Sequence, residues 1–183
     1  FSWSFFIAIA AAECGKLVSK ETKVDILVTP LVTILVGVGL SALVAPAIGS
    51  QLNYAKLGQV ITGIKELGFF TVVEAALGAD MVAQAEAGEL AEKGFLTSSC
   101  CPAFVNMVKK HFPTLAGNIS TTVSPMCATS RMLKAQDPET ITVFVGPCIA
   151  KKAETLYEEA GKYVDCTITF EEMQAMFDAK GID

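Results

Sequence analysis

The sequence predicts an α/β domain with a parallel or mixed sheet and flanking helices, preceded by an apolar helical segment. The first observation is that β-like apolar runs alternate with helix-like segments from residue 50 onwards. The second is that glycine, proline or a capping residue separates most of these segments. The third is that residues 1–49 contain few charged side chains. We therefore expect two parts, residues 1–49 as a candidate membrane segment and residues 50–183 as the α/β domain.

The N-terminal part consists of two apolar runs with a polar connector between them. Phe1–Ala12 is apolar, Glu13–Asp25 is polar, and Ile26–Ile48 contains no charged residue. A helix of that last length would span roughly 35 Å, which is enough for a bilayer. Prolines and glycines interrupt the run, and the Val/Ile-rich stretch Leu31–Val38 could equally be a buried strand. We favour the membrane interpretation because charge is absent over the required length.

Most of the predicted helices have a start or stop signal. Gly68 and Gly94 follow the first two, as glycine often does after a helix. Ser124 can cap the fourth helix, with proline at its first helical position. Thr169 and Glu172 have the spacing of a capping box. The predicted helices are Leu52–Leu67, Ala79–Glu92, Pro102–His111, Pro125–Gln136 and 170–180.

Two cysteine clusters carry the best clue to function. The expected strands are Phe69–Val73, Ile141–Val145 and Val164–Ile168. Cys100–Pro102 and Pro147–Cys148 each follow a β-like run and each open a helix-like segment. Because open α/β folds bind ligands at the carboxyl ends of their strands, we expect these thiols at one rim of the sheet.

Charge and cysteine usage limit the partners and the compartment. The net charge of -5 belongs to residues 51–183, which argues against a nucleic-acid partner. Adjacent cysteines cannot staple a fold in the usual way, and no ordinary signal peptide precedes them. We therefore expect a reducing, cytoplasmic location, with membrane association through residues 1–49. A start without Met and an end just after a helix pattern suggest a piece of a longer protein.

The thiols favour an iron-sulfur site over a zinc site. Thiolates bind both metals, but the paired C-x-x-C pattern of four-coordinate zinc is absent. Cys14, Cys127 and Cys166 each stand alone on an apolar pattern, so we expect small buried hydrophobic side chains there. Cys101 and Cys148 are the candidate ligands.

These residues resemble two motifs of the iron-only (FeFe) hydrogenases. Ser98–Phe104 (SSCCPAF) resembles the first active-site motif, T-S-C-C-P-x-W, and Gly146–Glu154 (GPCIAKKAE) resembles the second, M-P-C-x-x-K-x-x-E. The resemblance covers about residues 45–183. It implies a partial iron-only hydrogenase fold and the interconversion of protons, electrons and dihydrogen. The implied cofactors are a 4Fe-4S cluster and a diiron centre with CO, cyanide and azadithiolate ligands.

The resemblance also implies roles for individual residues. Cys101 and Cys148 would ligate the 4Fe-4S cluster, and Lys151 would donate a hydrogen bond to a cyanide ligand. The implied cofactor-binding residues are Ala45, Pro46, Ala47, Ser124, Gly146, Pro147 and Lys151. An electron partner is implied as well, either a ferredoxin-like carrier or a fused iron-sulfur domain.

A proton relay is implied at four positions. It would lead from Cys100 through Glu86 and Ser120 to Glu89. The residues themselves allow this, because Glu86 and Glu89 share one helix face, where carboxylates bridged by a hydroxyl or by water can pass a proton. A solvated acidic face and a turn serine are the alternative interpretation.

Three departures from the hydrogenase pattern leave other functions open. The family's third motif, E-x-x-x-C-P-x-G-C, is absent from the sequence, and Gly146 and Phe104 replace the usual Met and Trp, as in the sensory branch of the family. Residues 1–49 instead resemble a membrane IIC subunit of a sugar phosphotransferase system. The alternatives are therefore a membrane sugar-transport subunit fragment or a noncatalytic iron-sulfur redox or sensory module.

Overall fold

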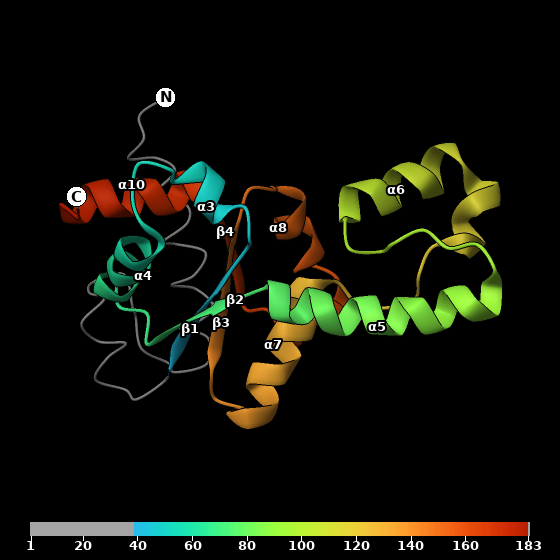
Figure 1. Ribbon diagram of the computed structural model, residues 1–183, viewed down its shortest axis with the longest axis horizontal. Coiled ribbons are helices and arrows are strands. Elements are labelled where there is room, and N and C mark those ends of the chain that lie inside the picture. Colours follow the sequence, from blue (N-terminus) through green and yellow to red (C-terminus); the bar gives the residue numbers. More distant parts are fainter. Residues whose placement is uncertain (1–38, 183) are drawn as a thin grey trace.

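The computed structural model describes residues 39–182, and its centre is a parallel sheet (Figure 1). Within these residues the sheet has four strands in the order β2-β1-β3-β4, and every neighbouring pair is parallel. This confirms the α/β prediction, with a parallel rather than a mixed sheet. The strands are β1 (Leu40–Val44), β2 (Thr71–Glu74), β3 (Ile141–Gly146) and β4 (Cys166–Thr169).

Strand β1 lies in the middle of the sheet although it comes from the run that suggested a membrane span. Ala42 and Leu43 are fully buried. The end of the uncharged run Ile26–Ile48 is therefore a core strand followed by the start of a helix, and the sheet includes residues on the N-terminal side of residue 49. The predictions for residues 1–38 fall outside the described residues. Between residues 39 and 182, no helix has both the length and the apolar character that a bilayer crossing requires.

Most helices follow the predicted signals, but the first begins later than predicted. Within the predicted helix Leu52–Leu67, residues 52–56 form a turn and Leu57–Glu66 is helical, while a separate four-residue helix, Ile48–Gln51, precedes that turn. Ser124 Oγ accepts the N–H of Cys127 at 3.4 Å, and Thr169 forms the capping box with Glu172. The helices are α3 (Ile48–Gln51), α4 (Leu57–Glu66), α5 (Ala76–Lys93), α6 (Pro102–His111), the 3₁₀ helix η1 (Pro113–Asn118), α7 (Pro125–Gln136), α8 (Ala150–Glu154), α9 (Glu158–Gly161) and α10 (Phe170–Lys180).

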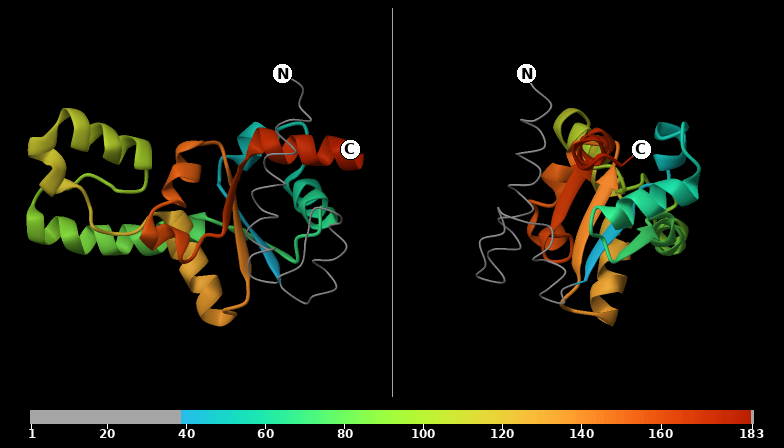
Figure 2. Two further views of the ribbon diagram at one scale, coloured as in Figure 1. Left: turned by 180° about the vertical axis from the view of Figure 1, so that it is seen from behind. Right: turned by 90° about the vertical axis from the view of Figure 1, so that its left-hand side faces the viewer.

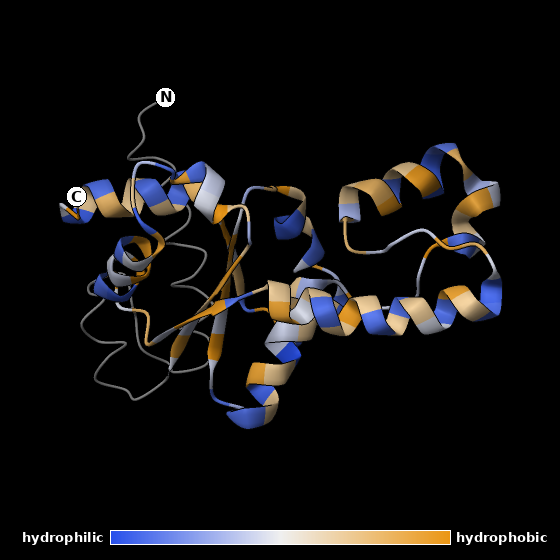
Figure 3. Cartoon of the chain, in the orientation of Figure 1, coloured by the Kyte–Doolittle hydropathy of each residue, from blue (hydrophilic) through white to orange (hydrophobic). Residues whose placement is uncertain are grey.

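The core lies between the sheet and the helices on its two faces. Helices α3, α4 and α10 lie on one face, and α7 with the start of α5 lies on the other (Figures 1 and 2). The two central strands, β1 and β3, are mainly hydrophobic (Figure 3). Burial of large side chains such as Leu43, Phe170 and Met173 supplies the main stabilisation.

A lobe projects beyond the sheet. The rest of α5 extends away from the strands, and α6 and η1 lie beside it (Figures 1 and 2). One parallel bridge, Thr97 with Ile119, joins the segment before α6 to the segment after η1. Its hydrogen bonds are Thr97 N to Asn118 O at 2.8 Å and Ser120 N to Thr97 O at 2.7 Å.

The prediction that both cysteine clusters follow strands of the sheet is wrong for the first cluster. The apolar pair before it, Phe95-Leu96, forms no strand, and Phe95 is 53% exposed. The pair is too short to form a ladder, and the chain there makes only the bridge at Thr97. Cys100 and Cys101 therefore belong to the lobe, and only Cys148 follows a sheet strand.

Candidate metal centre

The two cysteine motifs meet although they come from different parts of the fold. Lys151 Nζ donates a hydrogen bond to the backbone oxygen of Cys100 at 2.8 Å. Helices α6 and α8 also pack together, and Asn106 Nδ2 donates to the hydroxyl of Tyr157 at 3.2 Å. The segment that carries Cys148 therefore lies next to the segment that carries Cys100 and Cys101.

The Cys101 thiol caps helix α6. Its Sγ accepts the N–H of Phe104 at 3.5 Å, and Pro102 occupies the first helical position, where a missing N–H costs nothing. The side chain is partly exposed. The capping contact holds the sulfur at the first turn of α6, and a partly exposed thiol at a fixed position could serve as a metal ligand. Cys100, one residue earlier, is exposed.

The Cys148 segment lies at the carboxyl edge of the sheet beside another predicted site segment. Cys148 is partly exposed and follows the end of β3. The end of β1 runs alongside, because Ala45 N donates to Val145 O at 2.9 Å. Ala45 is buried, whereas Pro46 and Ala47 are exposed.

Gly146 leaves space that the Phe144 ring uses. A Cβ on Gly146 would lie 2.6 Å from Phe144 Cε1 and 3.4 Å from the Cβ of Ala45. A larger residue at position 146 would therefore displace the Phe144 ring. This packing accounts for the glycine at a position where the resemblance leads us to expect Met.

A buried ion pair supports the Lys151 side chain. Lys151 Nζ lies 2.6 Å from Glu154 Oε2, and the two side chains are 12% and 11% exposed. Cys127 Sγ lies 3.8 Å from the other oxygen of Glu154. Burial raises the pKa of the Cys127 thiol to about 11, so this thiol is protonated at neutral pH. Cys127 and Cys166 both belong to the core, as expected, and Cys14 lies outside the described residues.

The four predicted relay residues lie together in the lobe. Ser120 Oγ donates to Glu89 Oε2 at 2.8 Å, which joins the end of η1 to α5. Ser98 Oγ donates to Glu86 Oε1 at 2.9 Å and accepts the N–H of Cys100 at 3.3 Å. The Glu89 side chain is only 12% exposed. Glu86 and Glu89 are therefore both partly exposed carboxylates that accept hydrogen bonds from neighbouring segments.

Several polar contacts of this lobe were not predicted. Thr122 Oγ1 lies 2.7 Å from Ser120 Oγ and donates to Glu86 Oε1 at 3.4 Å. Lys93 Nζ lies 2.7 Å from Glu89 Oε1. The sequence carries a signal for each, because Ser120–Thr122 is a run of hydroxyl residues and Lys93 follows Glu89 by one helical turn. The other added donors are Ser99 N to Glu86 at 3.3 Å and Thr121 N to Glu89 at 3.1 Å.

The donor set suits part of an iron-sulfur site. In the described part of the chain, no group of three or more His, Cys, Asp or Glu residues is arranged to hold a metal ion. The two partly exposed thiols, Cys101 and Cys148, are soft ligands of the type that iron-sulfur clusters use. They could therefore supply some of the ligands of a cluster, with the others coming from another segment.

A family model for the iron-only hydrogenase large subunit, C-terminal domain, matches residues 39–183. The chain belongs to this hydrogenase family. The match begins one residue before β1, in agreement with the place of that strand in the sheet. A second model, for the phosphotransferase system EIIC, matches residues 3–68. Residues 39–68 are common to both matches, and in the structure they contribute β1, α3 and α4 to the hydrogenase-like domain.

Curated relatives include both hydrogenases and assembly factors. Iron hydrogenase 1 of Clostridium pasteurianum is 31% identical over 142 residues, which cover 67% of this chain and 25% of that protein. The cytosolic Fe-S cluster assembly factor NAR1 of Eremothecium gossypii is 31% identical over 140 residues, which cover 72% of this chain and 31% of that protein. The chain thus spans less than a third of the length of either relative. The family relates it to iron-sulfur proteins.

A solved hydrogenase structure has the same fold. Apo FeFe-hydrogenase HydA1 from Chlamydomonas reinhardtii matches with a TM-score of 0.72 and 23% identity, over 97% of this chain and 48% of that one. The hydrogenase-like fold is therefore confirmed, including the parallel sheet. At this identity the similarity concerns the fold alone.

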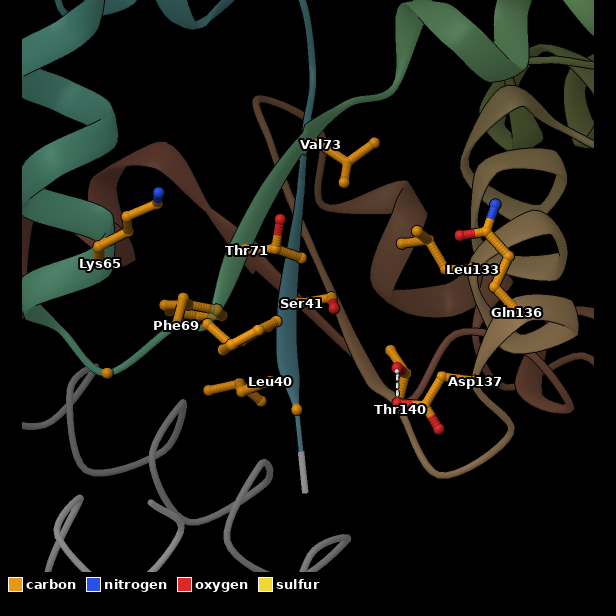
Figure 4. A pocket seen from close by; sticks show the side chains of 13 residues that line it. Leu40, Ser41, Lys65, Phe69, Thr71, Val73, Leu133, Gln136, Asp137 and Thr140 are labelled. Carbon is orange, nitrogen blue, oxygen red and sulfur yellow. Dashed lines mark hydrogen bonds between the residues drawn. The ribbon is translucent and has the colours of Figure 1, made fainter. Parts of the chain in front are cut away.

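A cavity of about 910 Å³ lies away from the hydrogenase-like thiol motifs (Figure 4). Its lining includes Leu40, Thr71 and Thr140, which lie at the starts of β1 and β2 and just before β3. Cys148 follows the opposite end of β3. This cavity therefore does not belong to the candidate metal centre.

Replacing Lys93 with methionine is expected to raise the pKa of Glu89. The Lys93 ammonium, with the Ser120 hydroxyl and the Thr121 N–H, lowers the pKa of Glu89 from 4.5 to about 2. Ionised Glu89 therefore stabilises the native state above pH 4.5, and this contribution is lost as the pH falls from 4.5 towards 2. Carboxyl ¹³C NMR titration of Glu89 measures the change.

The pKa of Glu89 in Lys93→Met should remain below 4.5, because Ser120 and Thr121 still donate to it. Lys65→Met on α4 is the matched control and should leave the Glu89 titration unchanged. An unchanged pKa of Glu89 in Lys93→Met would contradict the assigned cause.

Proposed function

We propose that the chain is part of an iron-only hydrogenase catalytic domain, in which Cys101 and Cys148 ligate a 4Fe-4S cluster. The observation that carries the proposal is the hydrogen bond from Lys151 to the backbone oxygen of Cys100, since it brings both cysteine motifs to one place. The family membership supports the same assignment. When bound, the cluster and a linked diiron centre with CO, cyanide and azadithiolate ligands supply the conversion between dihydrogen, protons and electrons.

The ligand thiols and the lysine have distinct tasks in this proposal. The contact of the Cys101 sulfur with the Phe104 N–H at the start of α6 fixes the position of this ligand. Glu154 and the Cys100 oxygen hold the Lys151 ammonium in place, and its remaining N–H would be available to a cyanide ligand. Ser124, at the start of α7, and the end segments of β1 and β3 would line the cofactor pocket. Those end segments are Ala45, Pro46, Ala47, Gly146 and Pro147.

The remaining polar residues are proposed to carry protons between the cofactor and solvent. The exposed Cys100 thiol exchanges a proton with the cofactor side, and Glu86, Ser120 and Glu89 conduct it along the lobe. Dihydrogen and protons are the substrates. The electron partner is a ferredoxin-like carrier or a fused iron-sulfur domain, and the proposed location is the cytoplasm. A sensory rather than a turnover role stays a prediction.

Maturation of the full-length gene product followed by iron analysis and infrared spectroscopy tests the function. The expected result is bound iron together with infrared bands of CO and cyanide, and hydrogen–deuterium exchange with dihydrogen. Absence of both the iron and the bands would end the proposal.

A noncatalytic iron-sulfur module is the second candidate. The NAR1 relative from Eremothecium gossypii, named as an Fe-S cluster assembly factor, favours it, because it is 31% identical over 72% of this chain. This candidate predicts cluster iron without CO or cyanide bands and without exchange activity. The same measurements therefore separate the two functions.

A further inference from the structure

Two of the predicted relay residues, Glu86 and Glu89, are connected through Ser120 and one further side chain in the described structure. The hydroxyl of Ser120 is bonded to Glu89 and to Thr122, and no bond from it to Glu86 is found among residues 39–182. Thr122 Oγ1 makes the connection, with Ser120 Oγ at 2.7 Å on one side and Glu86 Oε1 at 3.4 Å on the other. The second contact is the longer one, so it is the point where the connection is most easily broken.

We propose that the Thr122 hydroxyl carries protons and completes the proton route between Glu86 and Glu89. The inference rests on the proposed hydrogenase function for its physiological use. The connection between Thr122, Ser120 and Glu86 rests on the contacts of Thr122 alone. The stretch of the predicted relay between Glu86 and Glu89 thus gains one residue, with Ser120 and Thr122 as two successive hydroxyls.

The hydroxyls of Ser120 and Thr122 have too few hydrogens to make every contact between Glu86 and Glu89 a hydrogen bond. Three oxygen–oxygen contacts link Glu89, Ser120, Thr122 and Glu86, but the two hydroxyls contribute one hydrogen each. With both carboxylates ionised, one contact has no hydrogen. A single added proton supplies the missing hydrogen, so that all three contacts become hydrogen bonds. This proton can reside on Glu86 or on Glu89. In either case each hydroxyl donates its hydrogen towards the ionised carboxylate.

The two arrangements differ only in the positions of hydrogens. In the forward step the O–H bond of Glu86 breaks as Thr122 gains that proton, Thr122 passes its own proton to Ser120, and Ser120 passes its own to Glu89. One proton is transferred, each hydroxyl ends with one hydrogen, and no electrons are exchanged. Neither hydroxyl oxygen has to leave its position.

Both carboxylates at the ends of the route have further charged or polar neighbours. Lys93 Nζ at 2.7 Å and Thr121 N at 3.1 Å favour ionised Glu89. Glu86 accepts from Ser98 Oγ at 2.9 Å and from Ser99 N at 3.3 Å. A proton that enters the pair from the Cys100 side therefore meets Glu86 first and has the Thr122 hydroxyl as its next acceptor.

Variants that retain or remove the Thr122 hydroxyl test the inference. Thr122→Val keeps the branched shape and removes the hydroxyl, whereas Thr122→Ser keeps the hydroxyl. Alanine is less suitable, because Thr122 lines a cavity of about 510 Å³ where water could replace the missing group. Thr62→Val on the exposed side of α4 is the control for a threonine outside the lobe.

Two measurements on the matured full-length protein are decisive. Exchange between dihydrogen and deuterated solvent should slow about tenfold or more in Thr122→Val, and should remain close to the native rate in Thr122→Ser and Thr62→Val. In infrared difference spectra, the C=O stretch of protonated Glu86 should shift to higher frequency in Thr122→Val only. Loss of the band in Glu86→Gln identifies it.

Each outcome has one meaning. Native exchange together with a native Glu86 band in Thr122→Val would overturn the role of Thr122. If the native protein itself shows no exchange, the hydrogenase function fails, and the Glu86 band still decides whether Thr122 joins the two carboxylates. If the Thr122→Val protein loses its iron, the Thr122→Cys variant is measured instead. Because its S–H group is a weak donor, its exchange rate should lie between the native rate and the rate expected without any donor at position 122. A native rate in Thr122→Cys would again count against the proposal.

Discussion

Cys101→Ser is expected to abolish stable cluster binding in the full-length protein, whereas Cys100→Ser is expected to retain it. The two thiols are adjacent but have different surroundings. Cys101 caps α6 with its sulfur, while Cys100 is exposed and only its backbone oxygen is bonded to Lys151. Losing a ligand should weaken the affinity for iron by at least about 100-fold, since even residues that support a ligand contribute about 10- to 100-fold.

Iron and acid-labile sulfide analysis, with visible absorption, measures this difference. Cys100→Ser should keep the iron and lose dihydrogen exchange, because the hydroxyl of serine is a much weaker acid than the thiol. Iron retained in Cys101→Ser, or lost equally in both variants, would contradict the assignment of Cys101 as the ligand.

Gly78→Ala is expected to destabilise the domain by about 3 kcal/mol. A Cβ on Gly78 would lie 2.3 Å from both the backbone oxygen of Pro125 and Thr129 Oγ1, and 3.0 Å from the N atom of Thr129. Two of these atoms are backbone, and Thr129 is fully buried, so helix α7 would have to move away from α5. Gly78 thus allows the close approach of these two helices.

Gly88→Ala on the same helix is the matched control. No atom lies within 4 Å of a Cβ at position 88, which is exposed. Alanine should stabilise the domain there by up to about 1 kcal/mol, because it is the better helix former. Urea unfolding monitored by circular dichroism gives both free energies. Equal midpoints for the two variants would show that α5 and α7 do not pack as described.

The local elements were largely predictable, whereas β1 was not. Ser124 and Thr169 mark their helix starts by nearest-neighbour chemistry, which a short stretch of sequence contains in full. Strand β1 has two covered edges and a buried position, so it needs no polar alternation and resembles part of a membrane span. Only its pairing with β2 and β3 distinguishes this buried strand from a membrane span, and strand pairing is a property of the tertiary structure.

The candidate site was predictable as a set of residues but not as a set of connections. The relay positions followed from the family resemblance, and Ser120 is indeed bonded to Glu89. Thr122 reaches Glu86 only because the bridge between Thr97 and Ile119 brings the segment after η1 alongside the segment before α6. A contact that depends on such a long-range bridge leaves no local pattern in the sequence.

The position of β1 has a practical consequence for any shortened version of this protein. A chain trimmed to begin at residue 50, the boundary suggested by composition, would lack the strand that β2 and β3 share. Strand β2 would then be detached, and β3 would expose a long, apolar edge that invites aggregation. Shortened versions should therefore begin upstream of Leu40, even if the aim is to remove the apolar run at the start of the sequence.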